Sequence, residues 1–384
     1  MPRYSRRETL GLGAALLALA PLPGKATLDN TGPLLLSAAS DADDRHWVVG
    51  VRWRGTEIET LFREELPERA HHIAVNEALD CYVVVARRPG TWLQLGTLST
   101  GRLHDEVRVP ADRHVFGHGV FSADGKRFYT TESAFDNMTG DSGLVVEWQV
   151  EGSGATTALR RLREFSTRGV GPHELSLHPD GDTLIVANGG IRTHPDSARE
   201  NLNPDTMLPS LVYLDRHDGA LLEQRFLPEE YHQASIRHLD VNAAGLVALV
   251  MQFEGEPFLQ VPLVATHIRG ETLRLLLAPP ELQSQIKQYV GSVRFDQGGR
   301  YFAASCPRGN LLTFWDAESG ELIDSRRARD GCGLCAVADG FVFSTGTGRL
   351  GHVDLAAGTV NDFSVPPALE HLFWDNHMSR GEPG

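Results

Sequence analysis

Several features are scarce in this 384-residue chain, and each absence argues against a class of protein. No block of five or more Lys and Arg residues occurs and the formal net charge is −14, which argues against nucleic acid or an anionic membrane surface as partner. The sequence has no G-x-S-x-G elbow, no phosphate-binding loop and no H-E-x-x-H motif, so the common serine-hydrolase, nucleotide and zinc-protease signatures are missing.

Cysteine is also scarce, with four residues in the whole chain. Cys332 and Cys335 form a C-x-x-C motif, but Ala336 follows it where a haem attachment site needs histidine. A redox pair is one interpretation of this motif. Two half-buried cysteines on a strand are the interpretation that we favour.

Long hydrophobic runs are absent as well. The apolar run from Leu10 to Leu22 is shorter than the about 20 residues that span a bilayer. The pair Arg6 and Arg7 before this run, with small residues after it, predicts a cleavable twin-arginine signal peptide over residues 1–26. A retained membrane anchor is the alternative. We therefore expect a periplasmic protein whose residues 27–384 form a single domain without a stable membrane anchor.

A repeat of strands and tight turns runs through the rest of the chain. "GVFSADGKRFYTTE" is an apolar strand, an Asp-Gly turn and a second strand, because Gly accepts the positive φ of a tight hairpin. The last apolar residue of each first strand marks seven repeats, at Leu36, Val75, Phe121, Leu177, Val241, Phe295 and Val337. Successive markers lie between 39 residues (36 to 75) and 64 residues (177 to 241) apart, which brackets the length of a four-stranded propeller blade.

The repeat predicts an all-β fold, a seven-bladed β-propeller of the quinoprotein or lactonase kind. The C-terminal segment "LEHLFWDNHM" is expected to pack near or join the blade that begins with "LLLSAAS", since closure of the ring removes exposed sheet edges. Two β-sandwiches are the competing fold, and they fit less well because the period persists along the whole chain. Residues 279–290 predict a short helix.

Histidine or glutamate occurs at the same position of the repeat in several first strands. Counting three residues back from the markers gives His72, His118, Glu174 and His238, with His173 beside Glu174. Neutral imidazoles that converge with a carboxylate suit a transition metal, so we predict a site for iron or copper at the mouth of the channel. Asp240 or Glu132 is expected to accept a hydrogen bond from a ligand histidine. The alternative for each histidine is a structural clamp within its own blade.

Loops between second and third strands are expected at the same face of the ring. The segment 188–210 is a long insertion rich in Gly, Asn, Pro and charge, and such loops on a rigid scaffold carry binding residues. His194 in this loop is predicted as a further metal ligand. Arg88, Arg192 and Arg237 are predicted to contact a cofactor, although pairing with acidic loops is the plainer interpretation of such arginines.

Longer motifs give a family resemblance. "RRPGTW", "GHGVFSADG", "GPHELSLHPDG", "SIRHLDV" and the segment from Val186 to Asp215 together resemble an uncharacterised bacterial family of exported proteins, a domain of unknown function. The resemblance covers roughly residues 30–378 and implies a periplasmic β-propeller. It also implies gene neighbours of the imelysin-like and cytochrome kind, which points to iron handling. The family supplies no established catalytic residues.

Three hypotheses follow for the function. The favoured one is a monomeric periplasmic propeller that binds iron or copper for acquisition or delivery. The second is a metal-dependent propeller enzyme, either a lactonase-type hydrolase or an oxidoreductase. The third is a non-catalytic platform that docks an imelysin-like or cytochrome partner.

Overall fold

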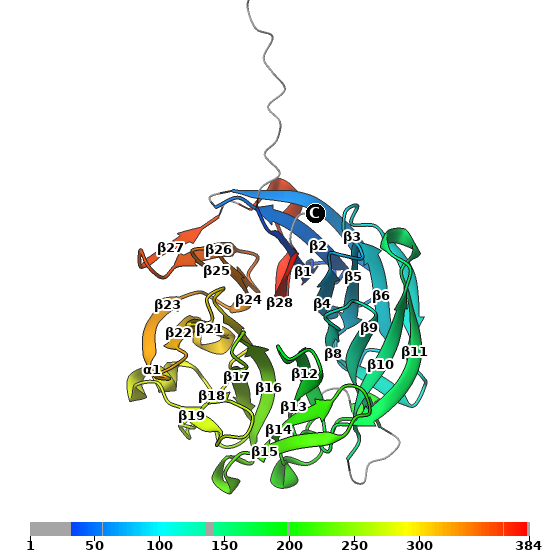
Figure 1. Cartoon of the computed structure of the whole chain (residues 1–384). Helices are drawn as coiled ribbons and strands as arrows, with labels where there is room; N and C mark the ends of the chain where they lie inside the picture. Colours follow the sequence, from blue (N-terminus) through cyan, green and yellow to red (C-terminus); the bar gives the residue numbers. More distant parts are fainter. Residues whose placement is uncertain (1–31, 56, 136–140, 198–199, 364, 382–384) are drawn as a thin grey trace, which may run out of the picture. The chain divides into compact units, whose positions relative to one another are not determined.

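The structure, a computed structural model, describes residues 32–381 apart from residues 56, 136–140, 198–199 and 364. In this part of the chain the strands form seven four-stranded antiparallel sheets around a central axis (Figure 1). The predicted seven-bladed β-propeller is therefore confirmed. The predicted signal peptide lies outside the described residues. No helix of the described residues is long and apolar enough to cross a membrane.

Each blade runs from an inner strand beside the axis to an outer strand at the rim. The blade that holds both ends of the propeller contains β28 (Phe373–Gly381), β1 (Leu34–Ser40), β2 (His46–Trp53) and β3 (Ile58–Leu66). The next contains β4 (Ala70–Asn76), β5 (Cys81–Ala86), β6 (Trp92–Thr97) and β7 (Leu103–Arg108). It is followed by β8 (Arg113–Phe121), β9 (Arg127–Ala134), β10 (Gly143–Glu151) and β11 (Ala158–Ser166).

The remaining four blades repeat this order. They contain β12 (Pro172–Leu177), β13 (Thr183–Asn188), β14 (Ser210–Asp215) and β15 (Leu221–Phe226), then β16 (Ala234–Val241), β17 (Val247–Phe253), β18 (Val264–His267) and β19 (Arg274–Leu276). The last two contain β20 (Ser292–Phe295), β21 (Tyr301–Cys306), β22 (Leu311–Asp316) and β23 (Leu322–Arg327), then β24 (Gly331–Val337), β25 (Gly340–Thr345), β26 (Leu350–Asp354) and β27 (Thr359–Asp362).

Helical segments are short and lie between the strands. The predicted helix near residue 280 is α1 (Pro280–Gln285). Single 3₁₀ turns are η1 (Gly154–Thr156), η2 (Pro195–Ser197), η3 (Pro204–Thr206), η4 (Glu229–Tyr231), η5 (Pro307–Gly309) and η6 (Pro367–Leu369).

The turns form as the Asp-Gly pairs predict. Between β12 and β13, Gly181 has a φ of 77°. The Asp180 carboxylate accepts hydrogen bonds from the backbone N–H groups of Asp182 and Thr183, both at 2.9 Å. An Asx turn of this kind satisfies the backbone where the chain reverses. "HPDG" is therefore a structural turn that fixes the register of the strand after His173.

The second strand of a blade is buried on both faces because neighbouring blades pack against it. All six residues of β5 are fully buried, and β13 and β17 are nearly continuous apolar runs of the same kind. A strand covered on both faces reads as an unbroken apolar run instead of an alternating one. The core therefore lies between the blades and holds the inner strands in place around the axis.

Closure of the ring places one strand differently from the prediction. β1, which contains Leu36, is the second strand of its blade, and the C-terminal β28 is the inner strand. β28 contacts the inner strands β24 and β4 on its two sides. The expectation that the C-terminal segment joins this blade is confirmed, but Leu36 is not the marker of an inner strand. The position equivalent to His72 in this blade is therefore on β28.

Candidate metal centre

The inner strands that carry the predicted histidines are irregular at the same point. On β4, His71 is an extra residue between Ala70 and His72, which both pair with β5. On β12, His173 is the extra residue before Glu174. Side chains on a regular strand alternate between its two faces, and a β-bulge interrupts this alternation. Two consecutive side chains of these strands can therefore both face the channel.

Polar side chains from five inner strands meet inside the channel. We call the following six residues the imidazole centre: His71, His118, His173, Glu174, His238 and His377. The ring centroid of His377 lies 4.5 Å from those of His71 and His238, and 4.6 Å from that of His118. The ring centroids of His173 and His238 are 4.7 Å apart. The four predicted residues His118, His173, Glu174 and His238 are brought together, whereas the sequence prediction missed His71 and His377.

The centre lies deeper than predicted. The side chains were expected at the mouth of the channel, but His118 and His238 are each only 1% exposed. His72 was also predicted as a metal ligand on an inner strand, and it is partly exposed. Its ring stacks at 5.2 Å on that of His118, so it lies beside the centre.

Close packing of the inner strands depends on one glycine. Gly117 has a φ of 108°, and a Cβ atom there would lie 2.6 Å from Cδ2 of His71. Such a separation is far below van der Waals contact, and the left-handed backbone disfavours any L side chain. Gly117 therefore allows β8 to pass close enough to β4 for His71 to reach the centre.

The donor atoms of the centre are close enough to share an ion. Three groups of side chains each bring one donor atom per residue within 4.8 Å of one another: His71, His118 and His173; His71, His238 and His377; and His118, Glu174 and His238. The Nε2 atoms of His71 and His377 are 3.2 Å apart. Two nitrogens bound to one ion at about 2.1 Å lie about 3–4 Å apart, so small side-chain movements would suffice for coordination.

Several imidazole nitrogens of the centre have no hydrogen-bond partner in the described part of the chain. They are both nitrogens of His118, and Nδ1 of His173 and of His377. Buried polar atoms are almost always paired, since leaving one unsatisfied costs about 1–3 kcal/mol. A neutral imidazole has one lone pair and one N–H, so a bound ion would satisfy one nitrogen of each ring. The donor set therefore fits a metal better than it fits a purely structural clamp.

Glu174 connects two of the histidines. Its Oε2 atom lies 2.9 Å from Nδ1 of His238, and its Oε1 atom lies 3.6 Å from Nδ1 of His118. Nη1 of Arg294 lies 3.7 Å from the same Oε1 atom. Burial alone would raise the pKa of Glu174, but the contacts with His238 and Arg294 outweigh it and lower this pKa. Glu174 is therefore a buried carboxylate with one oxygen that makes only long contacts.

A second carboxylate, Asp375, orients His71. Asp375 accepts from Nδ1 of His71 at 2.9 Å, from Nε of Arg69 at 2.8 Å and from Nη1 of Arg87 at 2.5 Å. Burial opposes its ionisation, yet the Arg87 charge and the His71 hydrogen bond hold the pKa of Asp375 well below its usual range. The proton on Nδ1 leaves the Nε2 lone pair of His71 directed toward the centre, as in many metal-binding histidines.

The predicted acceptors Asp240 and Glu132 do not have this role. Asp240 accepts from the backbone N–H of Phe295 at 2.8 Å. Glu132 accepts from both terminal nitrogens of Arg161, at 3.0 and 2.9 Å. Both carboxylates are committed within the scaffold, so the expectation was wrong for these two residues.

Burial keeps the imidazoles neutral. It lowers the pKa of His71 to about 3 and that of His72 to about 4. Burial together with the neighbouring imidazoles lowers the pKa of His118, His173 and His377 well below the usual value. Neutral imidazole is the form that coordinates a metal, so the centre is in its binding form at neutral pH.

The other predicted site residues lie elsewhere. The ring of His194 packs 5.2 Å from that of Phe135, and its Nδ1 lies 3.5 Å from Oδ2 of Asp196, so His194 is outside the three groups. The backbone N–H of Arg192 donates to Oδ1 of Asn203 at 2.6 Å within the 188–210 loop.

Arg88 and Arg237 are closer to the centre, because both line a small cavity of about 40 Å³ against His71, His173 and His238. We call it the Arg237 cavity. Nη2 of Arg237 donates to Oε1 of Gln252 at 2.9 Å. About one water fits such a volume, so the two arginines border the centre on this side.

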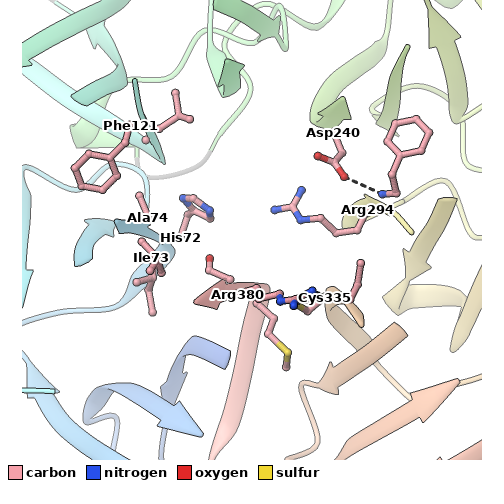
Figure 2. A pocket seen from close by; sticks show the side chains of 15 residues that line it. His72, Ile73, Ala74, Phe121, Asp240, Arg294, Cys335 and Arg380 are labelled. Carbon is pink, nitrogen blue, oxygen red and sulfur yellow. Dashed lines mark hydrogen bonds between the residues drawn. The ribbon is translucent and has the colours of Figure 1, made fainter. Parts of the chain in front are cut away.

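A larger cavity of about 350 Å³ lies on the other side of the centre, where the inner strands end (Figure 2). We call it the Arg294 cavity. Its lining includes His72, Phe121, Asp240, Arg294, Cys335 and Arg380. The four cysteines, Cys81, Cys306, Cys332 and Cys335, are all buried, and none of them forms a disulfide within the described residues.

The chain belongs to the family described as "Protein of unknown function (DUF1513)", whose model matches residues 64–381. The expected membership of an uncharacterised family is thereby confirmed. No curated protein matches the chain.

Solved structures resemble the fold more widely. The periplasmic gluconolactonase PpgL of Pseudomonas aeruginosa is 14% identical, with a TM-score of 0.63 over 91% of this chain and 99% of that chain. A putative 6-phosphogluconolactonase of Bacteroides uniformis is 11% identical, with a TM-score of 0.61 over 91% of this chain and all of that chain. Hydrazine synthase of Kuenenia stuttgartiensis is 14% identical, with a TM-score of 0.57 over 85% of this chain and 94% of that chain. At these identities the likeness establishes the fold alone.

Proposed function

We propose that this protein binds a transition-metal ion, iron or copper, in the imidazole centre. The observation that carries the proposal is the convergence of five buried imidazoles and one carboxylate, whose donor atoms lie within 4.8 Å of one another in three groups. Imidazole nitrogen suits iron, copper, zinc and nickel, whereas calcium and magnesium prefer oxygen ligands. The donor set therefore favours a transition metal over the alkaline-earth ions.

We further propose that the bound ion serves metal acquisition or delivery in the periplasm, and that the protein acts as a monomer. The N-terminal sequence supports export, with Arg6 and Arg7 before a short apolar run. The family resemblance supports an imelysin-like or cytochrome partner. His72 is partly exposed and lines the Arg294 cavity beside His118, which offers the ion a route between solvent and the centre.

A metal-dependent enzyme is the second candidate, and the similarity in fold to a gluconolactonase and a putative 6-phosphogluconolactonase favours it. A catalytic zinc site usually combines three protein ligands with a water in an open position. Each donor group of the imidazole centre has three side chains, so the number of donors fits this candidate as well as it fits metal delivery.

Elemental analysis of protein purified from the periplasm tests the metal proposal. We expect stoichiometric iron or copper in the wild-type protein, and its loss in the variant His118→Gln. The matched control is His114→Gln, because His114 is also fully buried but lies outside the three groups. A wild-type protein that holds no metal, even after reconstitution with Fe²⁺ or Cu²⁺, would contradict the proposal.

Release of the ion separates the two candidates. A delivery protein should lose its metal to a chelator without unfolding, and it should have no activity on lactones. An enzyme should retain the ion and hydrolyse a lactone, with loss of that activity in Glu174→Gln. If the protein retains the metal and hydrolyses a lactone, its function is catalysis and the delivery proposal is wrong.

A further inference from the structure

The Arg294 cavity is separate from the donor atoms of the metal centre and has its own chemistry. It is lined by the segments that follow the histidines on the inner strands, among them Ala74, Phe121 and Arg380. At about 350 Å³ it is large enough for a small organic molecule. In Figure 2 the Arg294 guanidinium and the His72 imidazole point toward each other across this space.

The charged groups of the cavity favour an anion. Two arginines, Arg294 and Arg380, line it together with one carboxylate, Asp240. The Oδ2 atom of Asp240 accepts a hydrogen bond from the backbone N–H of Phe295 at 2.8 Å. The lining therefore has an excess of positive charge.

The two arginines are held in place from different blades. Nη1 of Arg294 donates to the carbonyl of Val293 at 2.9 Å and lies 3.7 Å from Glu174. Nη1 of Arg380 donates to the carbonyl of Ala336 at 3.4 Å. The Arg294 side chain is 18% exposed and reaches into the cavity (Figure 2). Positioned guanidinium groups bind carboxylate and phosphate oxygens through pairs of parallel hydrogen bonds.

The remaining wall is apolar and discriminates between these two anions. Ile73, Val75, Val120, Phe121 and Met378 all line the cavity. An apolar wall contributes to affinity only when the ligand brings apolar surface of its own. Inorganic phosphate has none, whereas an organic acid has a carbon skeleton.

We propose that the Arg294 cavity binds a small organic carboxylate, with Arg294 and Arg380 contacting the carboxylate group and the apolar wall contacting the carbon skeleton. This inference goes beyond the proposed metal function, because no residue of the three donor groups lines the cavity. It is therefore tested on the metal-free protein, where a failure of metal binding has no influence on the result.

Calorimetric titration with three probes tests the proposal. Phenylacetate is the carboxylate probe, phenylacetamide is its uncharged isostere, and inorganic phosphate is the anion without apolar surface. We expect saturable binding of phenylacetate, and binding weaker by about tenfold or more for the other two. Equal binding of phenylacetamide, or binding of phosphate as tight as that of phenylacetate, would overturn the assignment, as would absence of phenylacetate binding.

Variants locate the binding site. Arg294→Gln and Arg380→Gln should each weaken phenylacetate binding by about tenfold, and the second variant leaves the Glu174 contact of Arg294 intact. The matched control is Arg300→Gln, because the Arg300 side chain is 73% exposed on a surface turn and lies outside the cavity lining. Unchanged binding in both cavity variants would show that the acid binds elsewhere and would overturn the proposal.

Discussion

The channel of this propeller has two unlike sides. Three residues before the markers, with Arg380 taken as the marker of β28, the inner strands β4, β8, β16 and β28 carry histidine and β12 carries glutamate. At the same position β20 carries Ser292 and β24 carries Leu334. Five blades therefore supply polar donors, while the other two supply small or apolar side chains.

The same position of the repeat therefore carries possible metal ligands in five blades and side chains of a different kind in the other two. Among the described residues, none of the three donor groups contains a residue of β20 or β24, and Arg294, two residues after Ser292, extends across the channel toward Glu174. The same architecture thus builds a crowded imidazole centre from five strands and a cavity wall from two. A propeller fold alone does not require either arrangement, so the difference in side chains carries the functional information.

The largest expected effect comes from exchanging side chains at this one position in two blades. His238 belongs to two of the three donor groups, and we expect His238→Gln to weaken metal binding by about a thousandfold, which is about 4 kcal/mol. Ser292→Ala, at the equivalent position on β20, should leave metal affinity unchanged. Competition with a chromogenic chelator measures both affinities.

This comparison needs a folding control. Thermal unfolding monitored by circular dichroism should show that both variants remain folded. If His238→Gln and Ser292→Ala bind metal equally well, the imidazoles of the five blades are structural and the distinction between the two sides of the channel has no functional meaning.

A smaller effect is expected from acid on the metal-free protein. The imidazoles of the centre have pKa values below 6.5 in the folded state, about 3 for His71, but near 6.5 in the unfolded chain. Between these values the unfolded state binds more protons, so stability falls as the pH falls from about 6.5 toward the folded pKa. We expect a loss of about 2 kcal/mol between pH 7 and pH 5 for an imidazole whose folded pKa is as low as that of His71.

Urea denaturation at pH 7 and pH 5 measures this loss. The variant His118→Gln/His173→Gln removes two of the titrating groups, and its stability should depend less on pH than that of the wild type. Replacement of Ser292 by Ala should leave the pH dependence as it is. Equal stability of the wild type at the two pH values would mean that the imidazoles are not desolvated as the structure indicates.

Much of the fold and part of the site could be predicted from the sequence. The Asp-Gly turns and apolar runs repeat because every blade packs against its two neighbours in the same way. This repetition made it possible to predict seven blades and the positions of His72, His118, Glu174 and His238. Their convergence follows from ring geometry, since equivalent positions on neighbouring inner strands face one axis. The depth of the site was not predictable, because it depends on how closely the strands approach each other.

The two missed histidines have separate physical reasons. His71 faces the channel only because a bulge interrupts the alternation of β4, and a single sequence gives no sign of a bulge at that point. His377 lies on β28, where Arg380 occupies the place of the apolar marker. The last apolar side chain of β28 is Met378, and three residues back from it is Asp375. The count would therefore have found the carboxylate that contacts His71 and missed His377, even with β28 recognised as an inner strand.

The smallest expected effect concerns His194, the predicted ligand that the structure places apart from the centre. Its ring contacts Phe135 and its Nδ1 faces Asp196, and none of the three donor groups contains it. His194→Ala should therefore change metal affinity less than twofold, within the small range typical of substitutions outside a site. The same chelator competition measures it beside His238→Gln. A loss comparable to that of His238→Gln would mean that the 188–210 loop closes over the channel when metal binds, and the centre would then extend beyond the inner strands.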